Sequence, residues 1–137
     1  MSKTLLLNLI TPQKQLLADL PVESVVLPAL SGEMGVLPGH IAMVVQLGFG
    51  SLRYKQNGQE AEFAVLGGFA EITHGAVDVF AEGAGLADEI DEEEEKQKIK
   101  RAKESLSKKD ADIDFELAEL EIKQALARMK VKHRHLS

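Results

Sequence analysis

The side chains of this sequence that could bind a metal or transfer a proton are few, and their spacing favours neither chemistry. His133 and His135 are two positions apart, which on a helix places them on different faces, so a shared metal ion is not expected. Cysteine is absent, which excludes disulfides and thiolate metal sites and fits a reducing compartment. Phosphate-loop, dinucleotide-binding, zinc-protease and nucleophile-elbow motifs are absent too. No catalytic residues are therefore expected.

A segment of constrained backbone carries two other polar side chains. Gly32-Glu33-Met34-Gly35 is followed by Pro38-Gly39-His40. This much Gly and Pro in a short stretch predicts a loop presented at the surface, and this loop contains Glu33 and His40. The alternative for Glu33 is an ordinary exposed acid in a turn.

The last fifty residues hold opposite charges in separate blocks. Residues 88 to 95 contain seven acids in eight positions, whereas the segment after Glu121 contains none. The bases of that segment are Lys123, Arg128, Lys130, Lys132 and Arg134. An antiparallel helix pair would bring the two blocks together, although each exposed pair contributes less than about 1 kcal/mol and is screened by salt. The alternative is that both blocks are ordinary solvated helix ends that complement the helix dipole.

The distribution of Pro and Gly predicts which elements position these side chains. All four Pro and all eleven Gly lie at or before Gly85. Because helix interiors reject both residues and turns need them, residues 1 to 86 are predicted to form a β domain and residues 87 to 137 a helical one. The β domain carries eight acids and four bases, and the helical domain fourteen acids and twelve bases. About half of the helical domain is ionised, so most of its surface faces water.

Short strands separated by turns are predicted in the first domain. Residues 4 to 10 and 22 to 27 are bounded by prolines, which cannot extend a strand ladder. Asn57-Gly58 is the preferred pair for a type I′ hairpin turn, and His74-Gly75 indicates a second hairpin. Eight to ten such strands imply a β-sandwich or a flattened barrel.

The second domain is predicted to be an antiparallel hairpin of two helices. Asp88 or Asp91 can cap the first helix, and a second helix start is predicted within Asp110-Ala-Asp112-Ile-Asp114-Phe, after a loop at Ser107-Lys-Lys. The second helix carries more apolar residues than the first helix can cover, and the remainder must pack against the β domain, pack against another chain or stay exposed. We therefore expect the hairpin to exchange partners. The two apolar stripes are Phe115, Ala118, Ile122, Ala125 and Met129, and Ile113, Leu117, Leu120, Ala127 and Val131.

Composition disfavours two further classes of protein. The net charge of −6, the single Tyr and the absence of Trp provide no basic patch with stacking aromatics, so nucleic-acid binding is not expected. No apolar run approaches the roughly 18 residues of a membrane span, and the first residues do not resemble a signal peptide. We expect a soluble chain that reaches a membrane only through a partner.

Several motifs resemble the epsilon subunit of bacterial F-type ATP synthase. They are Ser31 to His40, Leu66-Gly-Gly-Phe-Ala-Glu-Ile72, Val77-Asp-Val-Phe-Ala81 and Asp112-Ile-Asp-Phe115, and the resemblance covers the whole chain in order. It implies a β-sandwich of about ten strands followed by a two-helix hairpin, with no enzyme activity. It also implies a rotor subunit of the central stalk that couples rotation of the proton-driven c-ring to the gamma subunit.

The same resemblance assigns partners to particular residues. Glu33 would face the c-ring and His40 the gamma subunit. The helical tail would extend along gamma toward the alpha and beta subunits and block ATP hydrolysis, its basic residues meeting acidic ones there; those residues are Lys123, Arg128, Lys130, Lys132 and Arg134. The implied location is the cytoplasmic face of the bacterial inner membrane, as a peripheral component.

Some family members bind a regulatory ATP through an Ile/Leu-Asp-x-x-Arg-Ala motif, and this chain departs from it. Ile90 and Asp91 match, and Arg101 and Arg128 occupy basic positions of the pattern. The remaining positions differ, because Glu94, Glu95 and Gln124 replace the motif Arg, the motif Ala and a second-helix Arg. An anion beside a polyphosphate reverses the sign of the interaction. We therefore expect no ATP cofactor, and predict that Glu92 to Glu95 hold Arg128 and Lys132 directly.

Two rival functions can be separated from the rotor role. A free-standing β-sandwich binding module with a helical docking tail would not co-purify with gamma. A small β-barrel enzyme is disfavoured because no set of acid, base and nucleophile is present.

Overall fold

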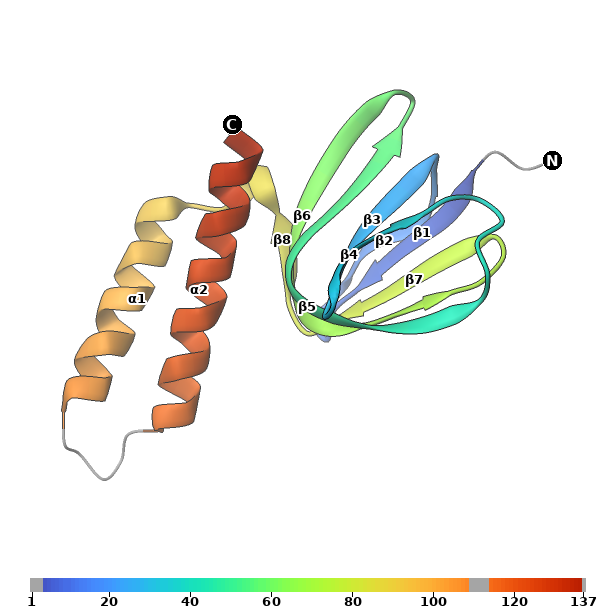
Figure 1. Cartoon of the computed structure of the whole chain (residues 1–137). Helices are drawn as coiled ribbons and strands as arrows, with labels where there is room; N and C mark the ends of the chain where they lie inside the picture. Colours follow the sequence, from blue (N-terminus) through green and yellow to red (C-terminus); the bar gives the residue numbers. More distant parts are fainter. Residues whose placement is uncertain (1–3, 109–113, 137) are drawn as a thin grey trace. The chain divides into compact units, whose positions relative to one another are not determined.

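The computed structural model describes residues 4–108 and 114–136, and the chain divides into two compact units, Met1–Leu86 and Ala87–Ser137 (Figure 1). The strands of the first unit are β1 (Leu5–Ile10), β2 (Gln15–Val22), β3 (Ser24–Ala29), β4 (Gly32–Val36), β5 (Met43–Gln56), β6 (Gln59–Ile72), β7 (Ala76–Ala81) and β8 (Ala84–Leu86). The second unit contains a 3-10 turn, η1 (Ala87–Glu89), and the helices α1 (Glu92–Ser107) and α2 (Phe115–Leu136). The predicted order of a β domain followed by two helices is confirmed.

The eight strands of the described residues form one sheet that folds over itself. Their order is β2-β1-β7-β6-β5-β3-β4, with β8 paired to β6. β1 and β7 are parallel, and the other pairs are antiparallel. Two strands are long: β5 and β6 have 14 residues each and pair along their whole length. The bend in this long ribbon, visible in Figure 1, produces the two layers of a sandwich.

Each long strand contributes one half to each layer. The first half of β5 and the second half of β6 continue into β7, β1 and β2. The other halves continue into β3, β4 and β8. If the two halves of β5 and of β6 are counted separately, each layer holds five strand segments. The total of ten matches the expected number of strands, although the described part of the chain forms eight continuous strands.

The bend lies where β5 and β6 carry glycines, Gly48 on β5 and Gly67 and Gly68 on β6. Pairing continues in one register from Met43↔Ile72 to Gln56↔Gln59, with a gap between Leu47 and Phe49. Beside this gap, Gly68 has a φ of +115°, and a Cβ placed on it would lie 2.0 Å from the Phe80 carbonyl oxygen. Only glycine fits such a backbone. The close approach of β6 to β7 therefore depends on the absence of a side chain here.

The hairpin turn between β5 and β6 was predicted correctly. Asn57 and Gly58 have φ values of 53° and 78°, the positive angles that a type I′ turn requires at both central positions. On β7, Val77 and Val79 are buried, as expected for alternate residues that point to one face of a strand. Local sequence therefore determines these elements.

Two expectations for the first unit were wrong. Gly32 to Val36 do not form a presented loop; they form β4, joined to β3 by a two-residue turn at Leu30-Ser31. The prolines also end strands only in part: β1 stops at Ile10, just before Thr11-Pro12, as expected. Pro21, however, lies within β2, an edge strand, and Pro28 lies within β3 where its pairing with β5 is irregular. Both positions need no ladder hydrogen bond from the proline nitrogen, which is why they tolerate it.

The core of the sandwich is aliphatic and lies between the layers. Leu5, Leu7 and Leu9 of β1 are fully buried, and so are Leu27 and Leu52 from the other layer. Each such side chain contributes about 1.5–3 kcal/mol by leaving water. The first unit is thus a rigid body by packing alone.

The two helices begin at capping aspartates. The Asp91 carboxylate accepts a hydrogen bond from the backbone N–H of Glu94 at 3.2 Å, and the Asp114 carboxylate accepts one from Leu117 at 3.0 Å. Of the two candidate caps for α1, Asp91 is therefore the one used. Ile113, expected in an apolar stripe, lies outside the described residues. Neither helix, as far as each is described, is long and apolar enough to cross a bilayer.

We predict that Gly68→Ala destabilises the sandwich by roughly 2–4 kcal/mol, because it adds backbone strain and overpacking at one position. Chemical denaturation of the full chain would measure this loss. Gly75→Ala is the matched control, since nothing lies within 4 Å of its added Cβ, and its effect should stay below about 1 kcal/mol. Equal stability of the two variants would contradict the role assigned to Gly68.

Candidate functional site

Glu33 lies at the start of β4 and is fixed by a cation on β5, the strand on the far side of β3. Its Oε2 atom is 2.6 Å from Nη2 of Arg53 on β5. The Arg53 side chain is largely buried, whereas Glu33 keeps about half of its surface exposed. Its position in a strand makes Glu33 a rigidly held acid rather than a mobile turn residue.

An apolar groove runs beside Glu33. It has a volume of about 580 Å³ and is lined by residues 29 to 34 and 43 to 46. Leu30 and Val44 on its rim are exposed, as are Leu37 and Ile41 in the following loop, where Ile41 reaches 77%. Exposed apolar side chains gathered at one place mark a protein-binding surface. Sequence reasoning missed them, although large apolar residues in a turn-rich segment were the available signal.

His40 lies in the loop between β4 and β5 and is turned toward its own backbone. Its Nδ1 atom is 2.8 Å from the carbonyl oxygen of Ile41, and its backbone N–H donates to Leu37. The preceding N–H, of Gly39, donates to the carbonyl of His74. His40 does not line the groove beside Glu33. The two predicted contact residues of the first unit thus belong to adjoining but separate surfaces.

Further apolar side chains are exposed on the layer that contains β7, β1 and the adjoining halves of β5 and β6. The rings of Phe69 and Phe80 stack with centroids 5.0 Å apart, and Phe69 is 48% exposed. Leu6 on β1 is also exposed on this layer. Since Phe69 pairs with Gln46 of the groove, the exposed apolar surface of the sandwich extends from the groove onto this layer.

In the second unit, a buried carboxylate joins the two helices. Glu95 on α1 is only 4% exposed. Its Oε2 atom is 3.3 Å from Nη1 of Arg128 on α2, and its Oε1 atom is 3.3 Å from Nζ of Lys98. Hydrogen bonds that involve charged groups are the stronger ones, and a buried charge without a partner is costly. Of the two bases expected to meet the glutamate run, Arg128 is found there.

Three more polar contacts join α2 to the start of the unit. His133 Nε2 is 2.7 Å from Glu92 Oε1, and His135 Nε2 is 2.5 Å from Asp88 Oδ1. The Lys132 ammonium donates to the backbone carbonyl of Asp88 at 3.2 Å rather than to a glutamate of the run. As expected from their spacing, the two histidines point to different partners. Within the described ranges, no cluster of side chains could hold a metal ion.

The titration of Glu92 is shifted by its neighbours. The hydrogen bond with His133 is the largest effect and lowers the pKa of Glu92 below its ordinary value of 4.5; burial opposes it, and the charges of His133, Lys96 and Lys132 lower the pKa further. A lowered carboxyl pKa stabilises the fold above its unfolded value, and this stabilisation is lost as the pH falls through the folded value. Acid below about pH 4 should therefore weaken this contact.

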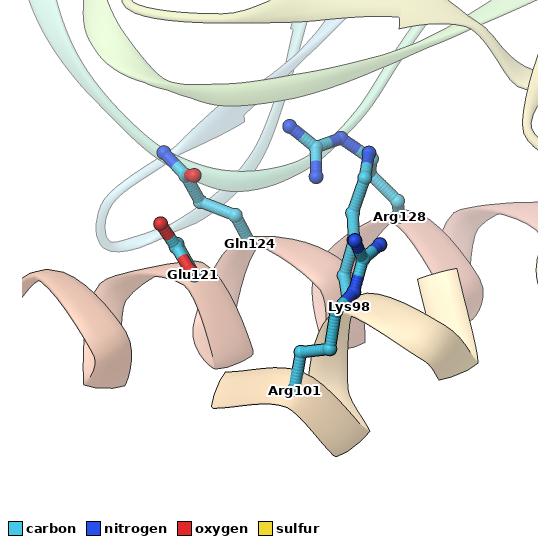
Figure 2. A pocket seen from close by; sticks show the side chains of 5 residues that line it. All are labelled: Lys98, Arg101, Glu121, Gln124 and Arg128. Atoms are coloured by element: carbon cyan, nitrogen blue, oxygen red, sulfur yellow. The ribbon is translucent and has the colours of Figure 1, made fainter. Parts of the chain in front are cut away.

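A cavity of about 400 Å³ is lined by side chains of both helices (Figure 2). It is lined by Lys98 and Arg101 from α1 and by Glu121, Gln124 and Arg128 from α2. Arg101 and Arg128 thus both line this cavity, whereas Ile90 and Asp91 do not, and Asp91 serves as the helix cap. Glu95 already contacts two of the cations that line it, Lys98 and Arg128.

The predicted basic contact residues divide into two groups. Arg128 and Lys132 turn toward α1 and η1, where they bind Glu95 and the Asp88 carbonyl. Lys123, Lys130 and Arg134 are exposed, and their spacing places them on one face of α2. The first group therefore stabilises the closed hairpin, while the side chains of the second lie at its surface.

The apolar surplus of α2 is visible in the structure. The residues that α2 buries are small or of moderate size, namely Ala118, Ala125 and Val131. Leu117 and Leu120 are 51% and 41% exposed, and Phe115 and Leu126 are exposed as well. The mismatch inferred from the sequence is thus present: α1 does not cover the large apolar side chains of α2.

Comparisons with known proteins agree along the whole chain. Residues 4–87 match the family model "ATP synthase, Delta/Epsilon chain, beta-sandwich domain", and residues 88–132 match "ATP synthase, Delta/Epsilon chain, long alpha-helix domain". The ATP synthase epsilon chain of Elusimicrobium minutum is 47% identical over 80% of this chain and 81% of its own length. That of Symbiobacterium thermophilum is 39% identical over 90% of this chain and 89% of its own.

A solved structure gives the same result. A chain in the cryo-EM structure of the Euglena gracilis mitochondrial ATP synthase, described as OSCP/F1/c-ring in rotational state 1, is 26% identical to this chain. It matches with a TM-score of 0.76 over 100% of this chain and 84% of its own length. The likeness therefore extends to the order and arrangement of elements.

We predict that Glu95→Gln loosens the helical hairpin by about 1–3 kcal/mol, because Arg128 and Lys98 lose their shared carboxylate in a buried position. Amide hydrogen exchange in α1 and α2 of the full chain would report the loss. Glu93→Gln is the control, since Glu93 is exposed and contacts only Lys96 of its own helix at 3.6 Å. An exchange rate in Glu95→Gln equal to that of the wild type would show that this contact does not stabilise the hairpin.

Proposed function

This chain belongs to the family of ATP synthase epsilon chains, non-catalytic rotor subunits of the central stalk, and we propose that its helical hairpin restrains ATP hydrolysis by leaving its closed form. Its partners are the gamma subunit, the c-ring and the alpha and beta subunits of the complex. The single observation that supports the proposal is the exposed apolar surplus of α2. A helix with unsatisfied apolar surface gains free energy by finding another partner.

The sandwich supplies the fixed part of the rotor. Its groove suits a contact with the c-ring. The apolar lining can be buried against a partner, and Glu33, held at one side by Arg53, can fix the orientation of that partner. The loop of His40 belongs to the gamma contact in this proposal. Rigid attachment requires preformed surfaces, and both lie on strands or short turns of a packed core.

The hairpin supplies the movable part. Arg128 and Lys132 bind Glu95 and the Asp88 carbonyl when the hairpin is closed. An acidic surface on the alpha and beta subunits would compete for the same two cations and would also meet Lys123 and Lys130, which are exposed already. Closure and inhibition therefore exclude each other through shared residues.

The energies of the two forms are comparable. Burying roughly 200 Å² of the exposed leucine and phenylalanine surface would contribute about 5 kcal/mol at 25 cal/mol per Å². Opening loses one buried carboxylate contact and several exposed ones, each exposed contact contributing less than about 1 kcal/mol. Small changes in conditions can thus shift the population.

The chain is a component of a membrane-associated complex. We infer that it is peripheral and lies on the cytoplasmic face of the bacterial inner membrane. The family membership supports this placement, together with the bacterial sources of the relatives.

Control of the closed hairpin is proposed to be independent of ATP. Glu95 provides inside the protein the negative charge that a nucleotide phosphate would otherwise bring to Arg128 and Lys98. Gln124 adds no charge to the cavity, and Glu121 on its wall is acidic. Repulsion between these carboxylates and a polyphosphate opposes binding.

We predict that deletion of residues 88 to 137 raises ATP hydrolysis by the assembled complex, because the inhibitory segment is lost. Lys123→Glu combined with Lys130→Glu should raise it in the same direction, roughly two- to tenfold, since two exposed pairs with an acidic surface are reversed. Steady-state ATPase assays of the reconstituted complex would measure both.

The control for that experiment reverses the same charge on the other helix. Lys100 and Lys103 of α1 are exposed, and Lys100→Glu with Lys103→Glu should leave hydrolysis close to the wild-type rate. Hydrolysis unchanged by the deletion in every nucleotide and salt condition would contradict the inhibitory function.

A further prediction concerns ATP itself. Calorimetric titration of the full chain with ATP should give no binding heat at millimolar concentrations, whereas added salt should increase proteolysis of the hairpin, because its polar contacts are screened. Glu95→Ala is the contrasting variant: it removes the carboxylate that contacts Lys98 and Arg128, so its ATP binding should be stronger than that of the wild type. A dissociation constant of about 1 mM or tighter for the wild-type chain would refute ATP independence.

A further inference from the structure

The polar contacts between the helices gather at one end of the hairpin. Arg128, Lys132, His133 and His135 make them from the last part of α2. The other end of α2 is tied to α1 by the connecting residues 108 to 114. Because a covalent connection prevents separation there, opening must begin at the C-terminal end of α2, where these contacts lie.

Two of the contacts at this free end are formed by imidazoles. His133 binds Glu92 at 2.7 Å, and His135 binds Asp88 at 2.5 Å. Histidine is the side chain whose unperturbed charge change falls between about pH 5 and 8. A neutral imidazole can still donate through Nε2–H, but a protonated one adds Coulomb attraction to the carboxylate. The strength of both contacts therefore varies over the physiological pH range.

We propose that His133 and His135 form a pH-sensitive latch, which holds the C-terminal end of α2 on the start of the helical unit when the imidazoles are protonated and weakens when they are neutral. Closure is then strongest in mild acid. It declines toward alkaline pH as the imidazoles lose their protons, and it declines again in strong acid as Asp88 and Glu92 become neutral.

The charged neighbours of the latch act in both directions. Glu92 on α1 and Asp88 on η1 favour the imidazolium form at contact distance. Lys96 on α1, with its Nζ 3.8 Å from Glu92 Oε1, opposes that form and competes for the same carboxylate. Lys132 and Arg134 flank His133 in the sequence and oppose the charge as well. The carboxylates are the nearer groups, so protonation has a net stabilising effect.

The position of the histidines on α2 strengthens this effect. Both lie in the last turn of the helix, where the dipole has its negative end and favours a cation. Their acidic partners precede or begin α1, where the opposite end of a helix dipole favours an anion. Antiparallel packing thus aligns each imidazole with a site that suits its charge.

The test is amide hydrogen exchange of α2 in the full purified chain between pH 5.5 and 8, corrected for the intrinsic pH dependence of exchange. In the wild-type chain, protection of the last two turns of α2 should fall by roughly two- to fivefold for each pair as the pH rises, the range expected for one exposed ion pair. In His133→Gln with His135→Gln this dependence should disappear. His74→Gln, which changes a histidine of the other unit, should retain it.

A second variant separates charge from shape. His133→Lys keeps a cation opposite Glu92 at every pH in this range, so its protection at pH 8 should resemble that of the wild type at pH 5.5. A wild-type chain with constant protection from pH 5.5 to 8 would overturn the latch, and so would an unchanged pH dependence in the double glutamine variant. Since exchange is measured on the isolated chain, this outcome is distinguishable from failure of the inhibitory function in the complex.

Discussion

The carboxylate of Glu95 is buried between two helices and must have cationic partners there, and this requirement controls the hairpin. A buried charge costs several kcal/mol unless it is paired, so Arg128 is drawn across from α2 to meet it. Lys98 completes the pairing from the same helix as Glu95. Glu95 thus supplies a negative charge to both cations from within the protein. For this reason the proposed control of the closed hairpin requires no bound anion.

The same arrangement makes closure conditional. The residues that α2 buries fully are no larger than valine, Ile122 and Met129 are only half-buried, and Leu117 and Leu120 stay about half exposed. Small buried side chains contribute little transfer free energy. Polar contacts at one end must then supply much of what holds the helices together, and those contacts respond to salt and pH. A hairpin with a larger apolar seam would stay closed under all conditions.

Sequence patterns predicted the elements whose causes are local. Asn57-Gly58 indicated a hairpin turn, and clusters of aspartates indicated the two helix starts, because each feature acts within a few residues. Which aspartate of each cluster caps the helix, Asp91 and Asp114, became clear only from the structure. The nature of β4 was not predictable in this way, since its glycines resemble a loop until pairing with β3 is known. The contact of Glu33 with Arg53 was missed for the same reason, because the two residues are 20 positions apart in the sequence and meet only once the sheet has formed. Composition could reveal the surplus of apolar residues on α2 but not the clustering of its polar contacts.

The energies explain why several weak contacts suit a regulatory segment. Moving a two-state equilibrium from 1:99 to 99:1 requires about 5.5 kcal/mol. One exposed pair supplies less than about 1 kcal/mol, so no single surface contact of the hairpin can drive the change alone. Burial of Leu117, Leu120 and their neighbours against a partner can supply most of the amount, and the cations released from Glu95 and Asp88 can supply the remainder. Release of the basic residues of α2 from Glu95 and Asp88 and binding of α2 to its partner must therefore occur together. This explains why the same basic residues take part in both.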